Sequence, residues 1–290
     1  MSDQVFTLQQ LEFFVVILVR VSGFVYTAPF FSLKNSPRTS KIGFTLLLSL
    51  VLFQATPYEP LEYMGVVGYA IVVAENLLAG VILGFLANVS YQILSLAGHM
   101  MDMQIGFSMV NEFDPVTSTQ VTVSGVVYEY AVMLVLMITY MHHYLIDALI
   151  DSFKVVPVGG VIINPLIYNV GLKYIVDFFV IAFRIVLPIF AALLIVNAIL
   201  AIMAKVAPQM NMFVIGMQLK VFVGLAVMLI VMQLIPTVGE LIFDEMFDLM
   251  RTAISYFVPK KNDKEQKVRK IRPLAYFHRY GIIQKDKKYQ

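Results

Sequence analysis

The chain has 290 residues, of which 59% are hydrophobic and 14% are charged, whereas soluble domains average about 45–50% and about 25%. Together with a mean hydropathy of +0.80, this composition excludes an ordinary soluble domain, because so much apolar surface would be left in large exposed patches. The sequence instead predicts an all-α integral membrane protein built from several hydrophobic helices. Because cysteine is absent, a disulfide framework and a cysteine-based metal or redox site are excluded as well.

The first apolar run, residues 13–31, is interrupted by Arg20. An arginine inside such a run faces an aqueous cavity or a polar partner, and we expect the partner to be a carboxylate on a neighbouring helix or subunit. A basic loop follows, with Lys34, Arg38 and Lys41. Because positive loops stay on the cytoplasmic side, this loop predicts a cytoplasmic turn.

Two further apolar runs differ in length. Residues 42–55 are too few to cross a bilayer, which needs about 20 residues. Residues 64–89 are long enough and contain Glu75. Gly80 and Gly84 lie four positions apart in this run, a spacing that predicts close contact with another helix.

A polar break follows at residues 104–120, after an amphipathic stretch at residues 91–103. Gly106 permits backbone conformations that other residues resist, and Pro115 disfavours a helical conformation of Asp114. We therefore predict a non-helical segment between two helices. In a membrane protein such a segment must be buried in protein or line a water-filled space.

The remaining body contains three apolar runs joined by turns. Residues 141–173, between the first and second of them, are predicted to be a mixed connection, and residues 237–257 have the spacing of an amphipathic helix. The three runs and their notable residues are 121–140 with Glu129, 174–204 with Arg184 and Pro188, and 212–235 with Lys220.

The carboxy-terminal tail, residues 258–290, has eleven Lys and Arg residues against three Asp and Glu residues. A basic tail after a membrane domain predicts a cytoplasmic location, and a solvated, flexible segment is the simplest structure for it. The sequence thus divides into a helical domain at residues 1–257 and a flexible tail at residues 258–290.

The topology of the apolar runs is not self-consistent for an isolated membrane protein. Six crossings place both termini on one side, whereas the basic loop puts the amino terminus outside and the tail puts the carboxy terminus inside, so one run cannot cross fully. Five runs also carry a central charge, which costs about 2.5–3.5 kcal/mol each in lipid. We infer a subunit of a complex, in which these charges pair between helices or between subunits: Arg20, Glu75, Glu129, Arg184 and Lys220.

Three stretches carry a resemblance to a known family. They are ENLLAGVILGFLANV at residues 75–89, GHMMDMQIGFSMVNEFDP at residues 98–115 and NAILAIMAKVAPQMNMFVIGMQLKVFVG at residues 197–224. The chain resembles the flagellar biosynthetic protein FliR family, which is homologous to the T subunit of the type III secretion export gate. The tail after residue 257 has no counterpart in this resemblance.

The resemblance implies a place in an assembly. Members of the family occur as one copy in a gate formed with P and Q subunits in the bacterial inner membrane, at the flagellar basal body, around a channel for unfolded proteins. Much of that gate is raised toward the periplasm. The implied partners are the P and Q subunits, other membrane proteins of the export apparatus, the basal body, unfolded cargo proteins and membrane lipids; no nucleic acid is expected.

The resemblance also implies a plug. In the family, a loop of this subunit projects into the channel and closes it at rest. Phe107, Met109, Val110 and Phe113 would form an apolar constriction that expels water and blocks ions, and methionine conforms to varied passing chains. The matching positions are Gly106, Phe107, Ser108, Met109, Val110, Asn111, Glu112, Phe113, Asp114 and Pro115.

The alternative function is a secondary transporter or ion permease, with Glu75, Arg184 and Lys220 forming an ion or proton site at the membrane midplane. Inverted repeats would favour this alternative, and the sequence shows none. The restoration of solute uptake by the chain alone would distinguish a transporter from a gate subunit.

Catalysis and bound cofactors are not expected. The sequence contains neither the GxxxxGK[ST] phosphate loop nor the GxSxG nucleophile motif. Two pairs have a spacing compatible with metal ligation, His99 with Asp102 and His143 with Asp147, but neither has a third ligand nearby. We expect no metal site.

Overall fold

The computed structural model describes residues 7–32, 37–107, 113–114, 119–120, 122–159 and 164–257, with only the backbone considered at 113–114 and 119–120. These residues all fall within one compact unit, Met1–Val258. The predicted tail, residues 258–290, lies outside the described residues.

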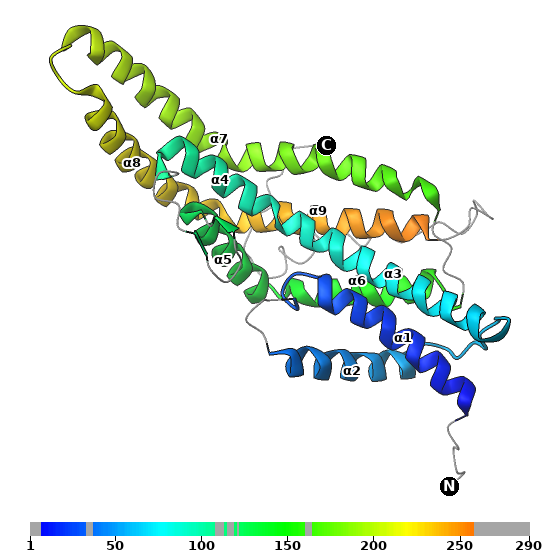
Figure 1. Ribbon diagram of the computed structural model, residues 1–290. Helices are drawn as coiled ribbons and strands as arrows, with labels where there is room; N and C mark the ends of the chain where they lie inside the picture. Colours follow the sequence, from blue (N-terminus) through cyan, green and yellow to red (C-terminus); the bar gives the residue numbers. More distant parts are fainter. Residues whose placement is uncertain are drawn as a thin grey trace, which may run out of the picture. The chain divides into compact units, whose positions relative to one another are not determined.

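The described part of the chain is almost entirely helical, which confirms the all-α prediction (Figure 1). A two-residue antiparallel pair, β1 (Phe113–Asp114) and β2 (Thr119–Gln120), and two short 3-10 helices, η2 (Pro165–Ile167) and η3 (Met232–Leu234), complete the described elements. The helices are α1 (Leu8–Thr27), α2 (Arg38–Ala55), α3 (Gly65–Tyr91), α4 (Ile93–Ile105), α5 (Val123–Ile138), α6 (Met141–Val155), α7 (Tyr168–Val206), α8 (Met212–Val231) and α9 (Ile235–Tyr256).

Helices α1 and α3 cross in close contact, as the glycine spacing predicts. A Cβ atom on Gly80 would lie 2.0 Å from the backbone oxygen of Arg20, and one on Gly84 would lie 2.1 Å from Oγ1 of Thr27. Any side chain at these two positions would therefore push the helices apart. The absence of side chains lets the two backbones approach, which is the usual basis of small-residue contacts between membrane helices.

Among the described residues, four helical stretches are long and apolar enough to span a membrane, or five if the bent pair α5–α6 counts as one span. Helix α2 is not among these candidate spans, in agreement with the prediction from its length. By contrast, the structure corrects the separation of residues 91–103 from the preceding run. Helices α3 and α4 meet at Gln92 and form one candidate span of 41 residues, Gly65–Ile105, because nothing at this junction breaks helical geometry.

The predicted mixed connection at residues 141–173 is also corrected, because its first half forms α6. Met141, Leu145, Leu149 and Phe153 recur every four residues and are all buried, which gives the helix an apolar face. The axis turns by 74° between α5 and α6, where Tyr140 takes a left-handed backbone conformation with φ of 58°. The opposite surface of α6 is polar.

Helices α7 and α8 pack against each other as an antiparallel hairpin (Figure 1). Helix α7 is 39 residues long, contains Pro188 and bends along its course (Figure 1), as expected where proline removes a backbone hydrogen bond. Helix α9 confirms the predicted amphipathicity, because Ile242, Met246 and Leu249 are buried while Asp244 and Asp248 are exposed.

Candidate functional site: the base of the 104–120 segment

The polar segment leaves α4 at a defined point. Helix α4 ends at Ile105 because Gly106 adopts φ of 99°, a left-handed conformation suited to glycine, and donates its N–H to the carbonyl of Asp102 at 2.9 Å. The chain returns to a helix at Val123. Between these helices the backbone pairs Phe113 with Gln120 and Asp114 with Thr119.

Four of the ten predicted plug residues lie within the described part of the chain. Gly106 and the partly buried Phe107 are described, and Phe113 and Asp114 are described only by their paired backbone. The remaining positions lie outside the described residues: Ser108, Met109, Val110, Asn111, Glu112 and Pro115.

A polar clamp joins the two ends of this segment. Asp102 is fully buried, and its Oδ1 accepts a hydrogen bond of 3.1 Å from the backbone N–H of Ser124 in the first turn of α5. A carboxylate at that place also faces the positive end of the helix dipole. Asp102 therefore holds the start of α5 against the end of α4.

Two glycines bring α4 and α5 into backbone contact beside this clamp. A Cβ atom on Gly98 would lie 2.1 Å from the Cα of Gly125, and one on Gly125 would lie 2.2 Å from Oγ1 of the buried Thr122. Sequence reasoning missed this contact and considered Asp102 only as a possible metal ligand. The available signal was the position of Asp102 and Gly98 on α4 just before the glycine that ends that helix.

A cavity of about 350 Å³ lies beside the base of the segment, between the end of α4 and the α7–α8 hairpin. Its wall is mainly apolar, but it includes the partly buried Lys220, which makes no hydrogen bond or ion pair with the described residues. Its lining residues are Met103, Gln104, Ile105, Gly106, Asn197, Leu200, Phe213, Gly216, Met217 and Lys220.

The predicted buried charges have different environments. Arg20 is 1% exposed. Its Nε and Nη2 donate to Oδ1 of Asn76 at 2.9 and 2.5 Å, and its Nη1 donates to the carbonyls of Ser152 and Val156 at 3.4 and 3.1 Å. The guanidinium also lies 4.2 Å from the ring centre of Phe153. The partner is therefore an amide of α3 and the negative end of α6, not the expected carboxylate.

The other four charges are less enclosed. Glu129 is partly buried and accepts a hydrogen bond from Ser95 of α4. Glu75 is also partly buried, whereas Arg184 is exposed and makes no pair with another described helix, so its predicted pairing between subunits stays a prediction. Arg184 lies on the outward face of α7 with the exposed Phe183 and Leu187.

The residues of the alternative transporter site are not joined in the structure. Within the described ranges, no hydrogen bond or ion pair links Glu75, Arg184 and Lys220 to one another. Likewise, in the described part of the chain no group of three or more His, Asp or Glu side chains is placed so that it could hold a metal ion. The site therefore consists of a segment whose two ends are held together by Asp102 and Ser124, beside a cavity lined by apolar and polar side chains.

Comparison with known proteins gives consistent matches along most of the chain. Residues 11–246 match the family described as bacterial export proteins, family 1. The flagellar biosynthetic protein FliR of Bacillus subtilis strain 168 is 30% identical over 247 residues, covering 83% of this chain and 94% of the relative. The FliR proteins of Escherichia coli K12 and Aquifex aeolicus are 27% and 26% identical, covering 82% and 85% of this chain and 91% and 96% of the relatives.

Proposed function

The chain belongs to family 1 of the bacterial export proteins, and on that basis we propose that it is a subunit of the flagellar protein export gate. In this proposal it forms part of the channel for unfolded flagellar proteins, and the segment from Gly106 to Pro115 closes that channel at rest. The FliR relatives, named for flagellar biosynthesis, support the flagellar assignment. The subunit acts as a conduit and a seal, with no catalytic step and no cofactor.

The observation that carries the sealing role is the clamp at the base of the segment. The hydrogen bond from Ser124 N–H to Asp102 fixes the two helix ends from which the segment leaves and to which it returns. The tight packing of Gly98 on Gly125 holds the same two helices together. A seal needs a fixed base, because a segment that moved with its anchors could not keep an opening closed.

The composition of the segment suits a seal. Phe107, Met109, Val110 and Phe113 are large and apolar, and an apolar constriction blocks ions by excluding water. The polar residues between them give the segment hydrogen-bonding groups that a wholly apolar loop would lack. Cargo proteins would displace the segment as they pass.

The assembly and location follow the same proposal. The partners are the P and Q subunits, with other export-apparatus proteins of the basal body around them, in the bacterial inner membrane. Helix α7 is 39 residues long, which at about 1.5 Å per residue is about 58 Å, whereas the hydrocarbon core is about 30 Å thick. This excess length supports a gate that is partly raised out of the bilayer toward the periplasm.

The decisive experiment shortens the segment in the assembled gate. Replacing residues 107–114 with a short Gly-Ser linker should make cells leak ions and small solutes while secretion of flagellar proteins continues. The readouts are the inflow of a small dye or of sodium and the secreted flagellar protein. A gate that assembles and remains tight with this replacement would contradict the sealing role.

A matched pair of double variants tests the apolar constriction. Phe107→Ala with Phe113→Ala should produce a weaker leak, because the constriction loses bulk. Phe107→Leu with Phe113→Leu retains most of the apolar volume and should remain tight. Equal leaks from the two pairs would show that apolar bulk at these positions does not matter.

A further inference from the structure

The outward face of α7 is apolar over a length that lipid cannot cover. Exposed side chains occur from Leu172 near its beginning through Phe183 and Leu194 to Val206 at its end. At about 1.5 Å per residue, these exposed positions extend over about 50 Å, and a hydrocarbon core of about 30 Å leaves a large part of them outside. Water is a poor solvent for that remainder, so protein must cover part of this face.

Arg184 shows where the protein cover is needed. It is exposed beside Phe183 and Leu187, and it makes no hydrogen bond or ion pair with any residue in the described ranges. It lies about 24 Å from the Tyr168 end of α7 and about 33 Å from the Val206 end, close to the middle of the helix and within the part that a hydrocarbon core of about 30 Å centred on α7 would cover. An arginine so placed is unfavourable in lipid and calls for an anionic or carbonyl partner.

Pro188, one turn after Arg184, leaves a backbone carbonyl of α7 without its usual hydrogen-bond donor. Proline has no N–H, so it cannot donate the usual helical hydrogen bond to the carbonyl four residues earlier, which is that of Arg184. The side chain of Arg184 thus needs an acceptor, and its carbonyl has lost its normal donor. Both needs arise at one level of α7, where Ile185 and Val186 are buried against the rest of the chain and Arg184 is exposed.

We propose that the face of α7 around Phe183, Arg184 and Leu187 is an interface, covered by a membrane helix of a neighbouring gate subunit that presents a carboxylate to the Arg184 guanidinium. The proposal builds on the gate assignment and specifies the chemistry of the partner surface. A carboxylate is favoured over a neutral partner because it forms paired, charge-assisted hydrogen bonds with the planar guanidinium. Charge complementarity thus distinguishes this partner from lipid.

The first experiment replaces Arg184 with leucine in the complex expressed with the P and Q subunits. If a carboxylate faces Arg184, Arg184→Leu leaves that carboxylate buried and unpaired, and the amount of co-purified partner should fall at least tenfold. If lipid covers the face, the same change removes an unfavourable charge, and an unchanged complex overturns the proposal. Lys205→Leu, at the exposed end of the same helix, is the matched control and should leave co-purification unchanged.

A compensating change identifies the facing residue. In the Arg184→Leu background, each intramembrane Asp or Glu of the partner subunits is changed to Leu in turn. One such change should restore co-purification, because an apolar pair can replace a buried ion pair without loss of stability. Failure of every such change to restore it overturns the carboxylate assignment.

The second experiment does not alter Arg184. Because the chain has no cysteine, Leu187→Cys introduces a single thiol on this face. In the assembled complex the thiol should react with a lipid-soluble maleimide at least tenfold more slowly than in the chain expressed alone, with SDS-unfolded complex defining full reaction. Equal reaction rates, indicating lipid, or a disulfide between two copies of this chain overturns the proposal.

These outcomes separate the inference from the function on which it rests. If the wild-type chain forms no complex with the P and Q subunits, the gate assignment fails. Suppose instead that the wild-type complex forms, that Arg184→Leu leaves co-purification unchanged, and that the complex does not protect the Leu187→Cys thiol from labelling. Only the interface inference then fails.

Discussion

Arg20 and Arg184 are both arginines within apolar helices, yet their surroundings are opposite. Arg20 is 1% exposed and its guanidinium donates to Asn76 and to two carbonyls at the end of α6. Arg184 is exposed on α7 and has no such partner among the described residues. The candidate spans differ in the same way, because 44% of the most apolar part of α1 is buried against 28% of that of the span containing α7. The chain itself supplies the partners of Arg20, whereas Arg184 has no partner among the described residues.

The largest expected effect on the free energy of unfolding comes from replacing Arg20, which has several hydrogen-bond partners. Arg20→Leu leaves Oδ1 of Asn76 and the carbonyl of Val156 without these donors, whereas the carbonyl of Ser152 still accepts from the N–H of Val156. Buried unpaired groups cost about 1–3 kcal/mol each. We expect the free energy of unfolding of the purified chain to fall by about 3 kcal/mol or more, measured by denaturant titration in detergent micelles.

The matched change Arg184→Leu sharpens this comparison. In the purified chain without partners it should not lower the free energy of unfolding, because no described contact is lost. Similar losses for Arg20→Leu and Arg184→Leu would show that the two regions do not differ as described.

A smaller effect is expected from adding one methyl group in each region. Gly80→Ala would place Cβ 2.0 Å from the backbone oxygen of Arg20, which cannot move without separating α1 from α3. Overpacking of this kind typically costs about 1–3 kcal/mol. We expect a clear decrease in the thermal unfolding midpoint.

Gly216→Ala is the control in the open region. Its Cβ would meet only the flexible end of Leu200, at 3.1 Å, and alanine favours a helix over glycine by about 1 kcal/mol. The unfolding midpoint should be unchanged or slightly higher. A decrease as large as that of Gly80→Ala would contradict the conclusion that Gly216 has more space beside it than Gly80.

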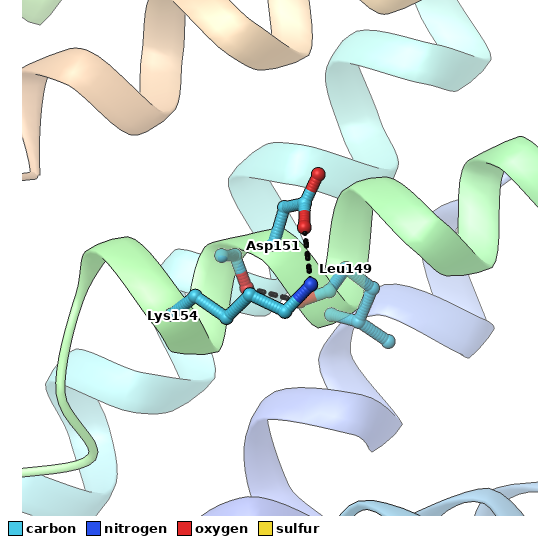
Figure 2. A network of polar contacts seen from close by, with 4 residues as sticks. Leu149, Asp151 and Lys154 are labelled. Atoms are coloured by element: carbon cyan, nitrogen blue, oxygen red, sulfur yellow. Dashed lines mark hydrogen bonds and ion pairs between the residues drawn. The ribbon is translucent and has the colours of Figure 1, made fainter. Parts of the chain in front are cut away.

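The smallest effect is expected at the surface of α6. Figure 2 shows Lys154 reaching back to Asp151, and their Nζ and Oδ1 atoms are 2.9 Å apart. Both side chains are substantially exposed, at 69% and 39%, and exposed ion pairs contribute about 0.2–1 kcal/mol. Lys154→Ala should shift the free energy of unfolding by about 0.5 kcal/mol or less in low salt, and the shift should decrease as salt is added.

The sequence predicted features that depend on local spacing or on backbone freedom. Gly80 and Gly84 predicted a close helix contact from their spacing alone, and Gly106 marked the end of α4 because glycine readily takes a positive φ. The apolar spacing in residues 237–257 predicted α9. Each of these signals lies within a few neighbouring residues.

Features that depend on distant residues were missed. The partner of Arg20 is Asn76, an amide 56 positions away, so sequence reasoning chose a carboxylate from charge alone. The role of Asp102 depends on a backbone N–H of Ser124 in the next helix. Helix α6 was assigned to a connection because Pro157 and Gly159 follow it, although its own residues have helical periodicity.

The uninterrupted course of α3 into α4 gives the molecule a single rod of 41 residues, about 60 Å long. Asn76, in the α3 part of this rod, accepts from Arg20 of α1. Asp102, near the end of the α4 part, accepts from Ser124 of α5, and the helix ends at Gly106. In the proposed gate, a polypeptide that pushed the segment aside would act on a loop whose two ends, at Gly106 and Ser124, stay anchored on α4 and α5. Opening and reclosing of that proposed gate would leave the contact between Gly98 and Gly125 unchanged.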